Sequence, residues 1–344
     1  MVSVTTDPLV DAARLDDWIG TRLPGAGEPC AVERMGEATG SGNALFWVRR
    51  GEHTFVLRRP PQVVNAPGAS DMTREYRILV ALEDTPVPHP HPLLLCDDPD
   101  VIGVPFLVME RVEGFTPVGR LPAPYDQPAS RRQLAMAMVD AVADLAAVDW
   151  RARGLDGLGK PDGFLERQVG RWLLQLDRYR TRDIPELDFV ANWLDRNRPQ
   201  MSPAAIMHGD YSPYNVMASP SSPERLAAVI DWDTGTVGDP LLDIGHLLAR
   251  WTEPGEQPVL GIEIEQRDGL PSRVELAQRY ADRSGRNLDA LRYYEVLSLF
   301  KLAIILEGPS ARRRLAGVPE ADNNAAIIDR LMRGAGDFAR GVRT

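Results

Sequence analysis

The chain divides into a β-rich first part and a mainly helical second part, and this division constrains the fold more than any other feature. Short strand-like runs separated by turns fill much of residues 1–113, together with one inserted helical segment over residues 72–84. After Gly114 a Pro-rich stretch leads into long helical segments, which are interrupted by strand-like runs over residues 204–231. Strands and helices that segregate along the chain indicate an α+β protein. We predict two lobes, 1–113 with a small antiparallel sheet and one helix, and 114–344, which is larger and mainly helical.

Local patterns predict several individual elements. Residues 8–21 carry apolar side chains at helical spacing, which predicts a short opening helix. A turn at residues 50–52 lies between two β-like runs and predicts a hairpin. In the second part a long helix is expected over residues 288–308. Sites tend to form in a cleft between two lobes, so we expect the chemistry there.

The charge and the cysteine content limit the partners and the compartment. The 344 residues carry a formal net charge of −10. Proteins that bind nucleic acids or anionic membranes usually do so through clusters of Lys and Arg. We therefore expect neither as the main partner. Cys30 and Cys96 are too few for a disulfide framework, so a reduced, cytoplasmic protein is expected. Residues 1–18 lack the pattern of a signal peptide, and no apolar run approaches the ~20 residues of a membrane span.

The run HGDYSPYN places His208, Gly209, Asp210 and Asn215 in one short segment. The apolar run before Gly209 and the run that ends at Asp231 are both strand-like, and we expect their ends side by side. Asp210 and Asp231 would meet there, with Asn215 on the loop between them. Carboxylate and amide oxygens suit Mg²⁺, and a carboxylate that stays off the metal can accept a proton from a hydroxyl. The alternative is that Asp and Asn serve separately as turn formers.

A Gly-rich turn in the first part could complement these carboxylates. Gly40, Ser41, Gly42 and Asn43 lie between two β-like runs. Because Gly lets the chain come close, backbone N–H groups of such a loop can approach phosphates. A simple hairpin turn is the alternative interpretation.

Arg58 and Arg59 lie on the strand that follows. Alternation along a strand turns one of them inward with Val56, and we expect this to be Arg58. A cation there could hold nucleotide phosphates, and Glu75 on the inserted helix could pair with it. The alternatives are a solvent-facing Arg pair and an ordinary exposed Glu.

These motifs together resemble the aminoglycoside phosphotransferase-like family of small-molecule kinases, which have a protein-kinase-like fold. The resemblance covers about residues 30–320, and HGDYSPYN followed by VIDWDTGTVGDPLLDIG is its most specific part. The segment VLRRPP is similar to one branch of the family, the kinase-like domains associated with acyl-CoA dehydrogenases. In this resemblance Arg58 stands where most of the family has a Lys, with Glu75 as its ion-pair partner.

The resemblance also implies roles for individual positions. Asp210 matches the catalytic Asp, and Asn215 and Asp231 match the Mg²⁺ ligands. Residues 40–43 match the loop that covers the phosphates. The remaining positions implied are the backbone near Glu110 to Val112 for adenine, a structural Asp243, a supporting His208, and Asp233 near the metal.

The function that the resemblance implies is transfer of a phosphoryl group from ATP, or another nucleoside triphosphate, with Mg²⁺. The acceptor would be a hydroxyl of a small molecule, such as a hydroxylated acyl group. A kinase that inactivates aminoglycoside or macrolide antibiotics is an alternative. Arg58 motivates an alternative of another class, a pseudokinase-like module that binds nucleotide or acts as a scaffold. The sequence leaves the oligomeric state open.

Overall fold

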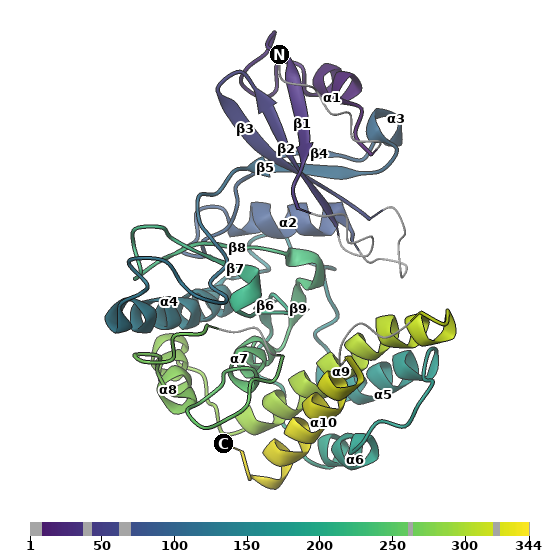
Figure 1. Ribbon diagram of the computed structural model, residues 1–344, viewed down its shortest axis with the longest axis vertical. Helices are drawn as coiled ribbons and strands as arrows, with labels where there is room; N and C mark the ends of the chain where they lie inside the picture. Colours follow the sequence, from purple (N-terminus) through teal and green to yellow (C-terminus); the bar gives the residue numbers. More distant parts are fainter. Residues whose placement is uncertain (1–8, 37–42, 62–69, 261–263, 319–323, 344) are drawn as a thin grey trace.

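The computed structural model describes residues 9–36, 43–61, 70–260, 264–318 and 324–343. Figure 1 shows a β-sheet at one end of an elongated molecule and a larger helical part at the other. The sheet has five antiparallel strands in the order β1-β2-β3-β5-β4. Their bounds are Cys30–Arg34 (β1), Ala44–Arg50 (β2), His53–Arg59 (β3), Pro92–Cys96 (β4) and Phe106–Glu110 (β5). The predicted α+β, protein-kinase-like fold with a small antiparallel sheet is confirmed.

The two faces of this sheet belong to different hydrophobic clusters. On β3, Leu57 points toward helices α1 (Ala12–Ile19) and α3 (Pro99–Ile102) and joins a cluster restricted to the sheet end. The opposite face packs against α2 (Met72–Leu82), and its residues join the cluster that fills the helical part. Because side chains alternate along a strand, Arg58 lies on this second face. The sheet therefore presents Arg58 toward the helical part.

Local sequence signals account for most boundaries at this end. The side chain of Asp11 caps α1 and that of Asp71 caps α2, each by accepting two backbone N–H groups. Gly51, with φ 58°, turns β2 into β3 as the sequence predicts. The short helix α3, capped by Asp98, is an element that the sequence analysis did not predict.

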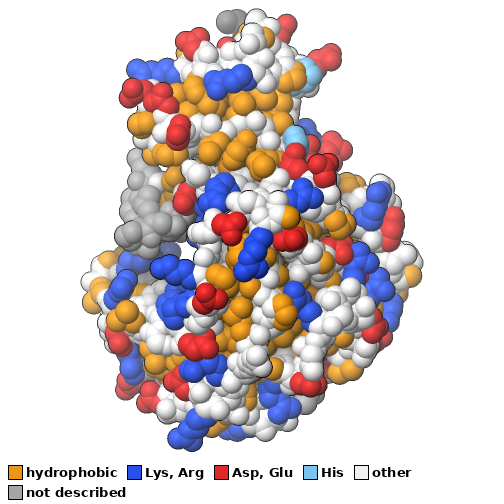
Figure 2. Space-filling view, turned by 180° about the vertical axis from the view of Figure 1, so that it is seen from behind, with side chains coloured by type: hydrophobic (Ala, Val, Ile, Leu, Met, Phe, Trp, Pro, Cys, Tyr) orange, Lys and Arg blue, Asp and Glu red, His pale blue; other side chains and the backbone are white. Residues whose placement is uncertain are grey.

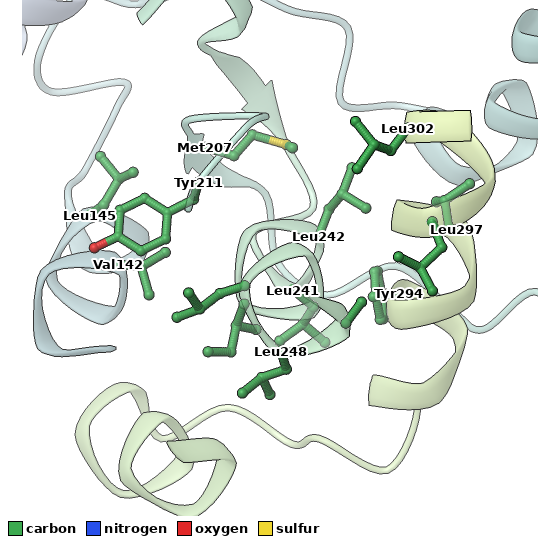
Figure 3. Packing of buried hydrophobic residues seen from close by; sticks show 14 of the residues in the cluster. Val142, Leu145, Met207, Tyr211, Leu241, Leu242, Leu248, Tyr294, Leu297 and Leu302 are labelled. Carbon is green, nitrogen blue, oxygen red and sulfur yellow. The ribbon is translucent and has the colours of Figure 1, made fainter. Parts of the chain in front are cut away.

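The helical part is built around α7 and α9, which pack against each other. Figure 3 shows Leu241, Leu242 and Leu248 of α7 beside Tyr294 and Leu297 of α9, all of them buried. The helices of this part are Pro128–Ala147 (α4), Phe164–Asp177 (α5), Leu187–Arg196 (α6), Leu241–Ala249 (α7), Arg273–Ser284 (α8), Leu291–Leu315 (α9) and Asn324–Arg340 (α10).

Two small antiparallel sheets lie inside the helical part, and their pairing corrects one expectation. Strand β6 (Ala205–Met207) pairs with β9 (Thr236–Gly238), and β7 (Val216–Ala218) pairs with β8 (Leu226–Val229). The run before Gly209 and the run that ends at Asp231 were expected side by side, but each has a different partner. Strands of three or four residues carry too little pattern to specify a partner.

Helix α9 continues beyond the predicted end at residue 308 and contains Pro309. Proline removes a backbone N–H, so the turn before it loses a hydrogen bond. The Tyr179 hydroxyl donates to the Ile304 carbonyl (2.7 Å) and supports this turn from outside the helix.

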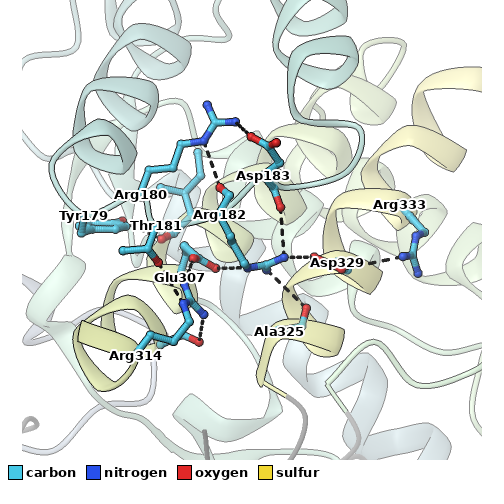
Figure 4. A network of polar contacts seen from close by, with 12 residues as sticks. Tyr179, Arg180, Thr181, Arg182, Asp183, Glu307, Arg314, Ala325, Asp329 and Arg333 are labelled. Carbon is cyan, nitrogen blue, oxygen red and sulfur yellow. Dashed lines mark hydrogen bonds and ion pairs between the residues drawn. The ribbon is translucent and has the colours of Figure 1, made fainter. Parts of the chain in front are cut away.

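An ion-pair network lies beside the same turn. Figure 4 shows Arg182 and Arg314 converging on Glu307 of α9. Arg182 also lies 2.6 Å from Asp329 of α10. Since Glu307 is fully buried, these two cations compensate a charge that would otherwise be costly. Tyr179 and Arg182, which follow α5, therefore stabilise the turn of α9 that precedes Pro309.

Among the helices within the described ranges, none is both long enough and apolar enough to cross a membrane.

Gly245 permits the close contact between α7 and α9. A Cβ at this position would lie 2.6 Å from Tyr294 Cβ. We expect Gly245→Ala to lower the free energy of unfolding by about 1–3 kcal/mol because the helices must separate. Gly170→Ala on α5, where a Cβ meets nothing within 4 Å, should instead be neutral or stabilise by about 0.5–1 kcal/mol. Denaturant unfolding of both variants measures this, and an unperturbed Gly245→Ala would contradict the packing argument.

Candidate active site

The loop after β6 is fixed by the carboxylate of Asp243 in the first turn of α7. Asp243 accepts the backbone N–H of His208 (2.6 Å) and that of Gly209 (2.8 Å). Gly209 has φ +83°, and a Cβ there would lie 2.7 Å from the Thr234 carbonyl oxygen. Asp243 is buried, and burial raises its pKa. This arrangement sets the direction in which the next residue, Asp210, projects.

Asp210 lies at the centre of a set of polar contacts. Its Oδ1 is 2.9 Å from Nε2 of His246, and its Oδ2 is 3.0 Å from the amide nitrogen of Asn215. Burial alone would raise the pKa of Asp210, but the His246 hydrogen bond and the charges of Lys301 and Arg250 hold it well below its ordinary value. Asp210 is therefore ionised at neutral pH and can accept a hydrogen bond or a proton.

His246 is buried on α7 and points at Asp210. Burial lowers its pKa to about 4, so the ring is neutral at pH 7. With its proton on Nε2, a neutral ring would donate to Asp210 and orient one of its two oxygens. Nη1 of Arg250 lies 2.9 Å from the same nitrogen.

Two hydrogen bonds join the loops that carry Asp210 and Asp231, one from the ring of His208 and one between backbone groups. Nε2 of His208 lies 2.9 Å from the Ile230 carbonyl oxygen, and the Ile230 N–H donates to the Asn215 carbonyl (2.9 Å). Asp210, Asn215 and Asp231 thus lie close together although their strands do not pair with one another. The supporting position expected for His208 agrees with this contact.

Asp231 has a left-handed backbone conformation, with φ 64° and ψ 66°. This region is unfavourable for residues other than Gly, and strained residues concentrate at functional sites. This left-handed conformation turns the chain sharply between β8 and the short 3₁₀ helix Trp232–Thr234. The Asp231 carboxylate is thereby directed toward the sheet and Arg58.

Arg58 connects the sheet to this loop. Its guanidinium lies 2.8 Å from Glu75, 2.5 Å from Asp231 and 3.1 Å from Asp233. Arg58 and Glu75 are both buried, and the expected ion pair between them is present. Burial opposes the charge of Arg58, but the three carboxylates raise its pKa, so it remains a cation. Arg59 is also buried, where the sequence left a solvent-facing pair as an alternative, and it donates to the Leu9 carbonyl on the other face.

The predicted phosphate loop is described only at its last residue. The amide nitrogen of Asn43 lies 2.8 Å from each carboxylate oxygen of Asp233. Gly40, Ser41 and Gly42 lie outside the described residues. Asp233 therefore contacts both Asn43 and Arg58, a link that the sequence did not predict.

Two cavities meet at this cluster. One of about 410 Å³ lies between the sheet and the helical part, and its lining includes Arg58, Glu75, Glu110, Val112, Asn215 and Asp231. The other, of about 890 Å³, lies within the helical part, and its lining includes Gln168, Arg171, Trp172, Asp210, His246 and Lys301. Asp233 lines both cavities. A molecule in each cavity would therefore face the other across the Asp210–Asp233 region.

Two side chains of this site, His246 and Lys301, were not predicted from the sequence. Both are polar residues inside strongly apolar helical runs, GHLL in α7 and LFKLA in α9. A buried polar residue in such a run needs a partner. That signal could have identified both.

The family of the chain follows from the comparison of its sequence with family profiles. The profile of the "Phosphotransferase enzyme family" matches residues 38–294. This match covers well over half of the chain, so the chain belongs to this family. The family predicted from the HGDYSPYN and VIDWD motifs is confirmed.

A curated relative confirms the predicted branch. Acyl-CoA dehydrogenase family member 11 from Rattus norvegicus is 32% identical over 318 residues, which are 90% of this chain and 41% of the rat protein. The chain thus spans about two fifths of the length of this relative.

Solved structures share the fold. A crystal structure from Ralstonia eutropha, described as a "putative aminoglycoside phosphotransferase", has a TM-score of 0.80 and 29% identity, and covers 96% of this chain and 98% of its own. A thermostable mutant of the aminoglycoside phosphotransferase APH(4)-Ia, in a ternary complex with ADP and hygromycin B, has a TM-score of 0.56 and 15% identity. That alignment covers 88% of this chain and 93% of the other. At this identity the likeness concerns the fold.

Asp243 can be tested as the residue that holds the loop. In Asp243→Asn an amide N–H₂ would face a backbone N–H, so one bond is lost and a donor is left buried. We expect the free energy of unfolding to fall by about 1–3 kcal/mol. Asp140→Asn, at a more exposed pair with Arg279 (2.7 Å), should cost about 1 kcal/mol or less. Equal losses in thermal or denaturant unfolding would contradict the role given to Asp243.

Proposed function

We propose that this protein uses ATP and Mg²⁺ to phosphorylate a hydroxyl group of an anionic small molecule. The observation that carries the proposal is that Asp233 lines both cavities, while Asp210 lines the larger one beside it. A phosphoryl donor in one cavity and an acceptor in the other would place their reacting atoms next to an ionised carboxylate. Membership of the phosphotransferase family supports this arrangement.

The cavity beside the sheet suits a nucleotide. Its apolar walls include Val56, Met109 and Ile230, which can pack against a purine. The backbone near Glu110 and Val112 would supply the polar edge that fixes the base. Arg58 would face the phosphates, since a guanidinium can bind two oxygens at once.

Asn215 and Asp231 would hold Mg²⁺ together with the phosphate oxygens of the nucleotide. The donor set fits, because the amide nitrogen of Asn215 is turned toward Asp210 and its oxygen, a hard ligand, points elsewhere. Within the described residues, no group of three or more His, Cys, Asp and Glu side chains could hold a metal alone. Mg²⁺ would screen the charge of the phosphates.

Asp210 would act on the acceptor hydroxyl. It would accept the hydroxyl proton while the oxygen forms a bond to the terminal phosphorus and the bond from that phosphorus to ADP breaks. His246 would hold Oδ1, and Oδ2, which also accepts from the amide of Asn215, would face the hydroxyl with its second lone pair. Most of the rate enhancement in such a transfer comes from positioning and charge stabilisation.

The lining of the acceptor cavity favours an anion. Its basic residues are Arg74, Lys160, Arg167, Arg171 and Lys301, and its acidic residues are Glu166, Asp210 and Asp233. By contrast, acidic and basic side chains are interspersed over the face shown in Figure 2. The matched relatives bear the name of acyl-CoA dehydrogenases, and coenzyme A thioesters are polyanionic. We therefore favour a hydroxyacyl compound, including a hydroxyacyl-CoA, as the acceptor.

Phosphorylation of an aminoglycoside is the second candidate. The description of the Ralstonia eutropha protein favours it. An aminoglycoside is a polycation, however, and a cavity with an excess of basic side chains would repel it.

Asp231 can be tested by calorimetry with ATP, with and without Mg²⁺. We expect Mg²⁺ to strengthen ATP binding to the wild type, and Asp231→Ala to weaken Mg-ATP binding by at least about tenfold. Asp17→Ala, at an exposed position of α1, is the control and should bind as the wild type does. ATP binding that is indifferent to Mg²⁺ in the wild type would favour the pseudokinase-like alternative.

Asp210 can be tested by phosphate transfer to hydroxyacyl-CoAs and to aminoglycosides. We expect transfer to the former, and Asp210→Asn should reduce its rate by about 10²- to 10⁴-fold with nucleotide affinity retained. A non-hydroxylated acyl-CoA is the control and should accept no phosphate. Full turnover by Asp210→Asn would remove Asp210 from this role, and transfer to aminoglycosides alone would establish the second candidate.

A further inference from the structure

Lysine is nearly absent from this chain, and both lysines line the acceptor cavity. Of the 39 basic residues, only Lys160 and Lys301 are lysine, and all the others are arginine. Even the position where the family usually has a Lys is occupied by Arg58. Lys160 is exposed at the cavity, whereas Lys301 lies on α9 and is only 8% exposed. Lysine at position 301 therefore stands out against the general use of arginine.

The ammonium group of Lys301 lies directly beside the catalytic loop. It donates to the carbonyl of Gly209, the residue immediately before Asp210. The ring of Trp172 lies 5.8 Å from Nζ on another side. An ammonium has three N–H groups, and Gly209 takes one of them. Lys301 and Asp210 both line the acceptor cavity. The charge of Lys301 therefore acts on the part of the cavity next to the Asp210 carboxylate.

A buried ammonium group is energetically unfavourable if its only role is to donate a hydrogen bond to the Gly209 carbonyl. Burying a charge destabilises the folded state unless the charge is compensated, whereas a neutral amide donor could make the same hydrogen bond. Burial lowers the pKa of Lys301, and the charges of Arg171 and Arg250 lower it as well, whereas the carboxylates of Asp210 and Asp243 raise it. These two carboxylates therefore favour the charged form of Lys301 beside Gly209.

The catalytic loop itself provides no cation. The four residues between Asp210 and Asn215 are Tyr, Ser, Pro and Tyr, and the segment 232–240 after Asp231 has no Lys or Arg either. A phosphoryl group in transfer carries negative charge on three equatorial oxygens, and stabilising that charge is a large part of catalysis. A cation on the Asp210 side must then come from another element.

We propose that Lys301 is the cation that contacts the phosphoryl group while it moves from the nucleotide to the acceptor. This inference rests on the proposed function. As the acceptor oxygen bonds to phosphorus, the bond to ADP breaks and Asp210 takes the hydroxyl proton, Lys301 pairs with an equatorial oxygen and keeps its own protons. A compact ammonium with three rotatable donors suits this place.

The test measures binding of a transition-state mimic and needs no acceptor. Calorimetry gives the affinity for Mg-ADP alone and for Mg-ADP with aluminium fluoride, an anionic mimic of the transferring phosphoryl group. We expect Lys301→Met to bind Mg-ADP as the wild type does but to lose roughly a hundredfold of the tightening that fluoride gives. Arg225→Met, which removes an exposed cation that lines neither cavity, should keep that tightening.

Lys301→Gln separates the charge from the anchoring of the loop, because it retains a neutral donor for the Gly209 carbonyl. A stable Gln variant that loses the fluoride effect supports the inference, also where Lys301→Met fails to fold. Retention of the fluoride effect in either variant would overturn it and leave Lys301 as an anchor of the loop. A wild type that binds Mg-ADP without any fluoride effect would also overturn it. A wild type that binds no Mg-nucleotide would instead refute the proposed function.

Discussion

The candidate site depends on the ion pairs of one buried guanidinium. Arg58 comes from the central strand of the sheet, Glu75 from α2, and Asp231 and Asp233 from the loop between β8 and β9. A buried cation persists only where carboxylates compensate it, so the positions of three elements are coupled to one side chain. A lysine ammonium is a point charge, whereas the fork of Arg can face several carboxylates at once. An Arg at this position thus links the sheet directly to the loop that carries Asp231 and Asp233.

The helical part fixes the opposite side of the site in a similar way. Asp243 holds the backbone before Asp210 from α7, and Lys301 holds the Gly209 carbonyl from α9. His246 then orients the carboxylate itself. Asp210 and the backbone before it are therefore positioned by buried polar side chains on two helices. Such preorganisation matters most in phosphoryl transfer, where the protein contributes position and charge more than covalent chemistry.

Long elements and specific motifs could be predicted from the sequence, whereas short or distant interactions could not. The hairpin around Gly51, the five strands and the kinase-like motifs carried clear local signals. The pairing of β6 with β9 did not, because strands this short fit several partners equally well. Helix α9 passes Pro309 with the help of Tyr179 and Arg182, residues more than a hundred positions earlier in the chain. The motifs predicted Asp233 near the expected metal site. Its contact with Asn43 could not be predicted, because the two residues lie far apart in the sequence and meet only in the folded chain.

The division of the sheet between two hydrophobic clusters has a consequence for how this family can evolve. One face, with α1 and α3, forms a closed interior of its own, whereas the face that packs on α2 shares its interior with the helical part. Recombination that cut the gene just after β5 would exchange the five strands. It would also separate the sheet face that packs on α2 from the helical part with which it shares a hydrophobic cluster. The outer layer can therefore change independently of the helical part, but the α2 layer must change together with the helices.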